Sequence, residues 1–596
     1  MNKITKLLSL LTLTALLGLP SLAAAEAQAT AVRSQVIGES LSLAYAEEKG
    51  EAQSVMVYIE DIDQESARSR VSTSEPTALT LSSVPEEYPN QHAIEAKQAE
   101  IMALRNASKE AYLKQNTAFA EKYLDGKVEY ISKYSPVIIA SLDSADANRL
   151  ALNSGVESIE LYEVEIAVED DSSTPAPMTT STTTDGTEYL DLIGATDVHP
   201  YYDGSGIKVG VLENGLPEQS YWPSIGLTSA RCFSFGQPFQ YAHHASQVAY
   251  TMKSVAPGAQ LYAAQAYFKH PSDETKNKFD YIQPIEWMLY YGVNVITISL
   301  AIDNGLRETY SPAAQWIDSI AWAYGVSVTI GAGNYNEQNE VLGVPGMSMA
   351  SNAITVGAVY SNGRLLDQSL YNDFNTTDIS KPDMCSIGDG VNIGFGNTSG
   401  GTSIATPQVA GAVALMCQQE PDIMGYPEVI KALLSANVNN TISTYEHKAS
   451  TTVPINNTNL FRKYGAGILD CENVYTALNA DRYYAGSFDE NSQNERYVRS
   501  VELEAGKTAR FALCYMRRSY YSSVNGTVTS YAPPSINISI KKDGQYLVTS
   551  LNLAGNMKII KFEPSVEGTY TVELDCNANI DYTAWYSFAW CQYSTN

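Results

Sequence analysis

The chain has 596 residues, which is long enough for about three domains. Lys and Arg number 38 against 66 Asp and Glu, so the formal net charge is −28, which disfavours nucleic acid and anionic membrane surfaces as partners. Seven cysteines show no zinc-ligand spacing, so a structural zinc site is not expected.

The first residues have the pattern of a secretory signal. Lys3 and Lys6 precede an apolar run over 7–22, and the small residues 23–25 offer a cleavage site. A membrane anchor is the alternative, but two threonines and a proline interrupt the run. We expect a signal peptide over 1–25, a secreted, extracellular protein, and no membrane span, since no later stretch is long and apolar enough.

A small α+β unit is predicted over residues 50–166. Its helices rest on apolar spacing and caps: Ile94, Ile101 and Leu104 recur at helical spacing, and Asp143 or Ser144 precedes a second helix that Gly155 stops. The order β-α-β-β-α-β is typical of a ferredoxin-like domain. The expected elements are strand 54–59, helix 90–124, strands 128–131 and 137–142, helix 145–152 and strand 156–166.

Residues 167–186 are rich in Asp, Ser, Thr and Pro, and this composition predicts a solvated linker. From 187 to 480, apolar strands alternate with helical stretches, which favours an α/β fold with a parallel sheet flanked by helices. The clearest strands are 207–212, 293–300, 326–330 and 353–358.

Residues 481–596 have a different sequence pattern, because apolar and polar residues alternate with period two in several stretches. This predicts a β-sandwich that binds a surface or glycan or supports the rest of the chain. Cys514, Cys576 and Cys591 lie here, and the sequence predicts one disulfide among them without choosing the pair.

Residues 401–411, reading GTSIATPQVAG, place Ser403 at the mouth of a helix expected over 405–416. A serine there meets unpaired backbone N–H groups and the positive end of the helix dipole, which suits a nucleophile beside a developing oxyanion. Pro407 is expected in the first helical turn, where a proline costs little.

Four upstream residues are candidate partners of this serine. Glu213 ends the first strand of the α/β region, His243 and His244 are adjacent in AHHASQVA, and Asn334 follows the strand 326–330. Taken singly, each is an ordinary turn, surface or packing residue. Their occurrence together, each at a strand or helix end, makes one shared functional site with Ser403 the better interpretation.

These segments resemble the subtilases, the subtilisin-like serine peptidases, over roughly residues 187–480. The family's His-Gly-Thr-x-Val-Ala motif is matched at His244, Val248 and Ala249, which selects His244 over His243. The resemblance implies a catalytic Ser403, with Asn334 in the oxyanion hole.

The acid departs from the family, whose motif is Asp-Thr/Ser-Gly where this chain has Glu213-Asn214-Gly215. A glutamate can orient a histidine, but its extra methylene moves the carboxylate by about 1.5 Å. The expectation is a Glu213–His244–Ser403 triad. The rival interpretation is a catalytically impaired binding protein on the same scaffold.

The resemblance also implies the surroundings of the site. Ser299, Leu300 and Ala301 are candidates to pair with the backbone of a substrate. The unit over 50–166 resembles the inhibitory propeptide of a zymogen, an accessory domain being the alternative, and the linker is the expected processing site.

The sequence thus predicts a secreted serine endopeptidase that acts on proteins or peptides, with its own propeptide as intramolecular inhibitor. No cofactor or metal ligand set is predicted, and calcium is left open because the sequence has no calcium-loop motif.

Overall fold

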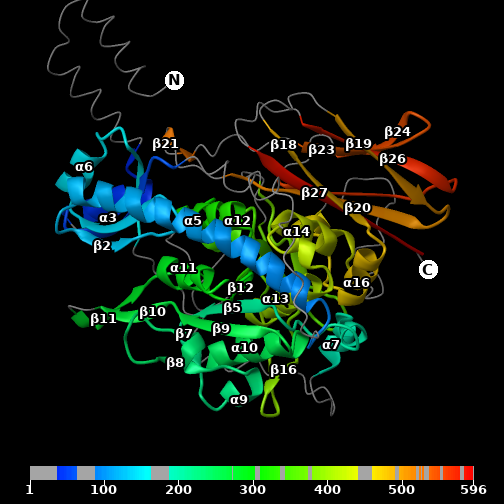
Figure 1. Ribbon diagram of the computed structural model, residues 1–596, viewed down its shortest axis with the longest axis horizontal. Coiled ribbons are helices and arrows are strands. Elements are labelled where there is room, and N and C mark those ends of the chain that lie inside the picture. The colour runs from blue at the N-terminus through cyan, green and yellow to red at the C-terminus, as the bar shows by residue number, and fades with distance from the viewer. Residues whose placement is uncertain are drawn as a thin grey trace, which may run out of the picture. The chain divides into compact units, whose positions relative to one another are not determined.

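The computed structural model shows the chain as helices and strands whose order is drawn in Figure 1. It describes residues 36–47, 49–62, 87–162, 187–270, 273–301, 309–335, 343–372, 379–439, 459–489, 496–518, 523–524, 527–528, 536–550, 555–576 and 583–594. The predicted signal peptide and linker lie outside these residues, as does the end of the strand expected up to residue 166. Among the described residues, no helix combines the length and apolarity needed to cross a bilayer.

Contacts divide the chain into two compact units. The smaller unit comprises residues 1–64, 107–165 and 519–531, and the larger unit comprises 65–106, 166–518 and 532–596. The long helix α5, Gln91–Tyr123, begins in the larger unit and ends in the smaller one.

The smaller unit is built on an antiparallel sheet of four strands in the order β2-β3-β1-β4. Asp143 caps α6, since its side chain accepts a hydrogen bond from the Asp146 N–H at 2.7 Å. One face of the sheet buries valine, isoleucine and alanine side chains. The elements are α3 Glu39–Glu47, β1 Gln53–Ile59, β2 Val128–Ile131, β3 Val137–Leu142, α6 Ser144–Leu150 and β4 Val156–Leu161, with the short strands β21 Ser523–Val524 and β22 Thr527–Val528.

The larger unit contains a parallel sheet of seven strands in the order β15-β14-β13-β12-β5-β9-β7. The strands are nearly all buried and apolar or β-branched, as strands covered on both faces require. The predicted parallel α/β fold is therefore confirmed. The strands are β5 Lys208–Glu213, β7 Cys232–Phe233, β9 Gln260–Gln265, β12 Val295–Ile298, β13 Ser327–Gly331, β14 Ile354–Val359 and β15 Met384–Ile387.

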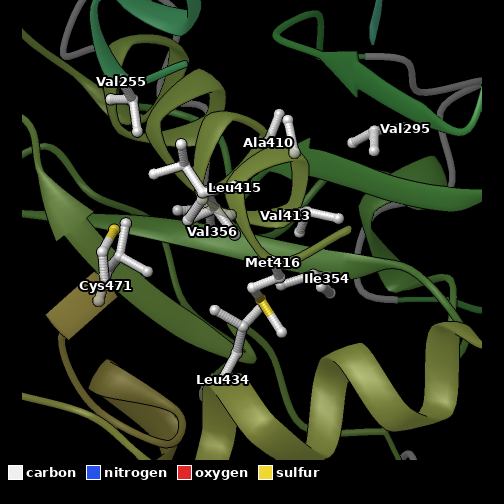
Figure 2. Close-up of a cluster of buried hydrophobic side chains, with 14 of the residues drawn as sticks. Val255, Val295, Ile354, Val356, Ala410, Val413, Leu415, Met416, Leu434 and Cys471 are labelled. Carbon is white, nitrogen blue, oxygen red and sulfur yellow. The ribbon is translucent and has the colours of Figure 1, made fainter. Parts of the chain in front are cut away.

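Helix α13, Thr402–Gln419, crosses this sheet and is buried along almost its whole length. Figure 2 shows its side chains Ala410 and Val413 near Val356 of β14, with Leu434 of α14 in the same cluster. A helix that is apolar on all sides belongs in a core, so α13 is held on every side. The other helices of this region are α7 Glu188–Leu192, α8 Ala195–Val198, α9 Trp222–Ile225, α10 His243–Val255, α11 Ile282–Tyr290, α12 Pro312–Tyr324, α14 Pro427–Ala436, α15 Asn459–Tyr464 and α16 Cys471–Asn479, and the short strands are β6 Leu216–Pro217, β8 Tyr241–Ala242, β10 Tyr267–His270, β11 Asp273–Phe279, β16 Val391–Gly394 and β17 Asn397–Ser399.

The last part of the chain forms two antiparallel sheets of four strands, β18-β27-β20-β25 and β19-β26-β23-β24. Both sheets contribute to one hydrophobic cluster, and the first also packs on α14, where Arg510 donates to the Ser435 carbonyl at 3.1 Å. These strands therefore belong to the larger unit. They are β18 Tyr483–Phe488, β19 Arg496–Leu503, β20 Thr508–Tyr515, β23 Ile536–Lys542, β24 Gln545–Thr549, β25 Met557–Phe562, β26 Gly568–Cys576 and β27 Ala584–Tyr593.

The predicted disulfide is wrong, because none of the seven cysteines, all of which the structure describes, forms a disulfide bond. Cys514 pairs in register with Ser587, and Cys591 pairs with Arg510, so the two cysteines are four residues apart along neighbouring strands. That offset is about 13 Å, beyond the roughly 7 Å that a disulfide can span between Cα atoms. Cys576 lies in the other sheet and faces the cluster between the two sheets.

Candidate active site

The predicted site residues come from the carboxyl ends of neighbouring parallel strands. Glu213 is the last residue of β5, Ser299 follows β12, and Asn334 comes three residues after β13. Since β5, β12 and β13 are adjacent and parallel, their ends lie along one edge of the sheet. This is the edge at which α/β folds place their ligands.

Glu213 and His244 are joined directly. The Glu213 Oε2 lies 3.0 Å from the His244 Nδ1, an ordinary hydrogen-bond distance. The Glu213 side chain is 1% exposed and that of His244 is 23% exposed. Glutamate, which is one methylene longer than the family's aspartate, thus still contacts the histidine. The other imidazole nitrogen, Nε2, lies on the side of the ring away from the carboxylate.

His243 forms a separate pair with Glu218. Its Nδ1 lies 3.1 Å from the Glu218 Oε2, and both side chains are more than 40% exposed. The ring also meets Tyr221 edge-on, with centroids 6.2 Å apart. The sequence selected His244 over His243, and no motif around Glu218 marks it as a partner of His243.

Ser403 is the second residue of α13 and is 5% exposed. Gly401 precedes the helix with φ 115°, a conformation that suits glycine. The helix packs against α10, which begins with His243 and His244, and the approach is close at Gly411, where an added Cβ would lie 2.6 Å from the Val255 Cβ. This glycine therefore lets the serine helix and the histidine helix meet.

The sequence predicted Pro407 in the first helical turn, and this is wrong. Helix α13 already begins at Thr402, so Pro407 lies in its second turn. A proline inside a helix has no N–H for the carbonyl four residues earlier, which here is that of Ser403. That carbonyl instead accepts a hydrogen bond from the Ser299 Oγ at 3.0 Å. Ser299 thus contacts the residue predicted as nucleophile and compensates for the proline.

Asn334 is oriented by the start of the same helix. Its Oδ1 accepts a hydrogen bond from the Thr402 N–H at 3.0 Å, so the Nδ2 amide group is on the other side of the side chain. An added Cβ on Gly401 would lie 3.2 Å from the Asn334 Nδ2 and equally near the Gln368 Nε2. Side-chain amides therefore lie beside the turn that leads to Ser403, and the role of Thr402 in positioning Asn334 was not foreseen.

The other two predicted substrate-binding residues follow Ser299 in the chain. Leu300 is 8% exposed, and Ala301 is half-buried at the end of the described segment. The described residues contain no group of three or more His, Cys, Asp or Glu side chains arranged to hold a metal ion.

Comparison with known proteins identifies the family. A sequence profile described as the Subtilase family matches residues 242–467, a range that includes His244, Asn334 and Ser403 but starts after Glu213. Subtilisin E of Bacillus subtilis is 29% identical over 311 residues, which are 50% of this chain and 74% of that protein. Pyrolysin of Pyrococcus furiosus is 29% identical over 220 residues, 31% of this chain but only 15% of its own length.

The crystal structure of fervidolysin from Fervidobacterium pennivorans, a keratinolytic enzyme related to subtilisin, aligns with a TM-score of 0.44. Its sequence identity is 16%, and the alignment covers 90% of this chain and 72% of fervidolysin. The family profile and the subtilisin relatives agree with the structure. The parallel sheet is present, and the matched histidine and serine segments each lie at the start of a helix. Residues 242–467 therefore belong to the subtilase family.

Proposed function

We propose that this protein is a secreted serine endopeptidase that hydrolyses peptide bonds with Glu213, His244 and Ser403. The observation that carries the proposal is the 3.0 Å contact between the buried Glu213 carboxylate and the His244 Nδ1. A carboxylate in this place fixes the histidine tautomer so that Nε2 is the basic nitrogen, and it stabilises the imidazolium that forms.

The proposed reaction follows from this tautomer. The His244 Nε2 removes the proton from the Ser403 hydroxyl while its Oγ attacks the peptide carbonyl, and the imidazolium then gives that proton to the leaving amine. Water repeats the sequence on the acyl-enzyme and releases the carboxylic acid. The burial of Glu213 supports its part, because a charge held away from water interacts more strongly with the imidazolium.

The oxyanion is assigned to two donors, the Ser403 N–H and the Asn334 Nδ2. The first N–H groups of a helix have no carbonyl partner within it, and α13 begins one residue before Ser403. The bond from Thr402 to the Asn334 Oδ1 supports this role, since it holds the amide in one orientation before any substrate arrives.

Ser299, Leu300 and Ala301 are assigned to the substrate backbone, because the segment leaves the edge of the sheet next to Ser403. Export is supported by the signal-like residues 1–25. The four-stranded unit, with its strand order β2-β3-β1-β4, supports a ferredoxin-like propeptide, whose linker over 167–186 would enter the site and be cut.

Fluorophosphonate labelling tests the reaction. The purified full chain should be labelled at Ser403, and the Ser403→Ala variant should not. Equal labelling of the two proteins, or no labelling of a folded wild-type chain, would favour the impaired binding protein instead.

N-terminal sequencing of exported protein tests the processing. A new terminus between residues 167 and 186 is expected, and it should be missing from the Ser403→Ala variant if the protein cuts itself. A terminus only near Glu26 in both proteins would contradict the propeptide assignment.

A further inference from the structure

The first half of α5 lies in the larger unit and packs on it along one helix face. Ile94, Gln98, Ile101 and Arg105 are spaced by four, three and four residues, which places them on one stripe. Ile94 and Ile101 are 0% and 6% exposed and belong to the same hydrophobic cluster as the parallel sheet. We call residues Tyr88–Asn106 the clamp.

Arg105 ends the stripe and is fully buried. Its guanidinium donates to the carbonyls of Leu289 at 3.4 Å, Val293 at 2.8 Å and Tyr324 at 3.4 Å. Leu289 is in the last turn of α11 and Tyr324 is the last residue of α12. A cation at these positions meets the negative ends of two helix dipoles, and the planar fork of arginine can reach several carbonyls at once.

Asn90 does the same for α13. It precedes α5 with φ 63°, and its Nδ2 donates to the carbonyls of Gln418 and Gln419, each at 2.9 Å. These are the last two carbonyls of α13, the helix that carries Ser403, and such groups have no partner within the helix. The clamp therefore contacts the carboxyl ends of three helices of the catalytic region.

The clamp lies at the edge of the sheet opposite the candidate site. Gln98 donates to the Gly206 carbonyl at 2.8 Å, just before β5, and Val293 and Tyr324 precede β12 and β13. The site residues follow the other ends of these same strands. Strands of four to six residues separate the two edges by roughly 13–20 Å, so the clamp can stay in place without covering the site.

We propose that the clamp is a permanent part of the catalytic fold, so that a cut between residues 167 and 186 leaves the N-terminal fragment bound through residues 88–106. The mature protein is then a two-piece molecule in which a segment N-terminal to the cut completes the ends of α11, α12 and α13. Because the clamp contacts the end of the sheet opposite the candidate site, departure of the whole N-terminal fragment is not required. The retention of the fragment depends on the proposed function only in one respect, namely that the cut is the step that produces the mature enzyme.

The test uses the full chain with Ser403→Ala, so that it does not depend on catalysis. A recognition sequence for an unrelated site-specific cysteine protease replaces residues within 172–183, and the purified chain is cut there. Both pieces should co-elute in equal amounts at low micromolar concentration, with a thermal midpoint within about 2 °C of the uncut chain. Separate elution without denaturant, with the larger piece still folded at the same midpoint, would overturn the proposal.

Substitutions separate the clamp from other contacts of the fragment. Arg105→Ala should weaken retention about 10- to 100-fold, the range expected for losing hydrogen bonds of a charged group. Lys114→Ala, which removes an exposed cation from the same helix outside the clamp, is the matched control and should change nothing. Equal retention by Arg105→Ala and the control would also overturn the proposal.

Asn90→Gly is the second test variant, for use if Arg105→Ala does not fold. Glycine accepts the same backbone conformation, and the substitution removes only the side chain that carries the amide. Hydrogen exchange of the last turn of α13 should then rise about fivefold or more, while β20 stays protected. Unchanged exchange in α13 would mean that its carboxyl end does not need the clamp.

Discussion

Two glutamate–histidine pairs lie next to each other at the start of α10, and they differ mainly in burial. Glu213–His244 and Glu218–His243 have nearly the same bond, 3.0 and 3.1 Å between Nδ1 and Oε2. The Glu213 carboxylate is 1% exposed, whereas that of Glu218 is 41% exposed. An ion pair exposed to water contributes little free energy to stability, because the solvent screens it. A buried carboxylate is screened less, so its removal costs the imidazole a stronger interaction. Burial, and not hydrogen-bond geometry, therefore distinguishes the proposed catalytic pair from the surface pair.

Removing each histidine gives the largest expected contrast. His244→Ala should lower kcat/KM by at least about 10,000-fold, because it removes the proposed base of Ser403. His243→Ala should stay within about threefold, since its ion pair is exposed and screened. Hydrolysis of a chromogenic peptide measures both, and similar losses in the two variants would break the comparison.

Neutralising each glutamate comes next. Glu213→Gln should lower kcat by about 1,000- to 10,000-fold, because an amide can no longer stabilise the imidazolium and favours the wrong tautomer. Glu218→Gln is the matched control and should lose less than about threefold. Circular dichroism checks that both proteins are folded. A large loss of activity in Glu218→Gln would mean that Glu213–His244 is not the pair that supports catalysis.

Shortening the acid sharpens the comparison further. Glu213→Asp restores the family residue, but it withdraws the carboxylate by about 1.5 Å from a contact that is now 3.0 Å long. We expect a 10- to 100-fold lower kcat, since small displacements at a catalytic contact are costly. A variant as active as the wild type, or more active, would show that the backbone is not adapted to glutamate.

A third glutamate tests the effect of burial on a carboxyl group outside the site. Burial raises the pKa of Glu160, in β4 of the smaller unit, to about 8 from its usual 4.5. The folded state then holds a proton that the unfolded state has lost. The stability of the smaller unit should fall by a few kcal/mol as the pH rises from about 4.5 to 8 and should level off above 8.

Hydrogen exchange of β1, which pairs with β4, measures this pH dependence after correction for intrinsic rates. Glu160→Gln keeps the shape of the side chain, cannot ionise and should flatten the curve. A wild-type curve that rises through the same window would contradict a proton held by the buried carboxyl group.

Most of the larger unit's framework was predictable because its signals are local. Apolar and β-branched runs predicted β5, β13 and β14 to within one residue of their observed bounds. The order of the motifs placed Glu213, His244, Asn334 and Ser403 at strand and helix ends. The resemblance to the subtilases then chose between the two histidines.

What failed depended on contacts between distant residues. The position of Pro407 was misjudged by a turn because α13 starts earlier than its apolar run, at a glycine whose conformation the sequence does not reveal. The disulfide was wrong because register in β20 and β27 separates the cysteines. Arg105 was not noticed, since its partners are 184 to 219 residues away and are all backbone carbonyls.

The sequence by itself determined which residue types stand at the ends of which elements, because hydrophobic period, glycine and proline act over a few residues. Tertiary structure alone decided which glutamate is buried against a histidine, which hydroxyl replaces the N–H that Pro407 lacks, and what closes the carboxyl ends of α11, α12 and α13. Those outcomes depend on which strands and helices become neighbours, and burial, which sets the strength of each polar contact, exists only once the chain has packed.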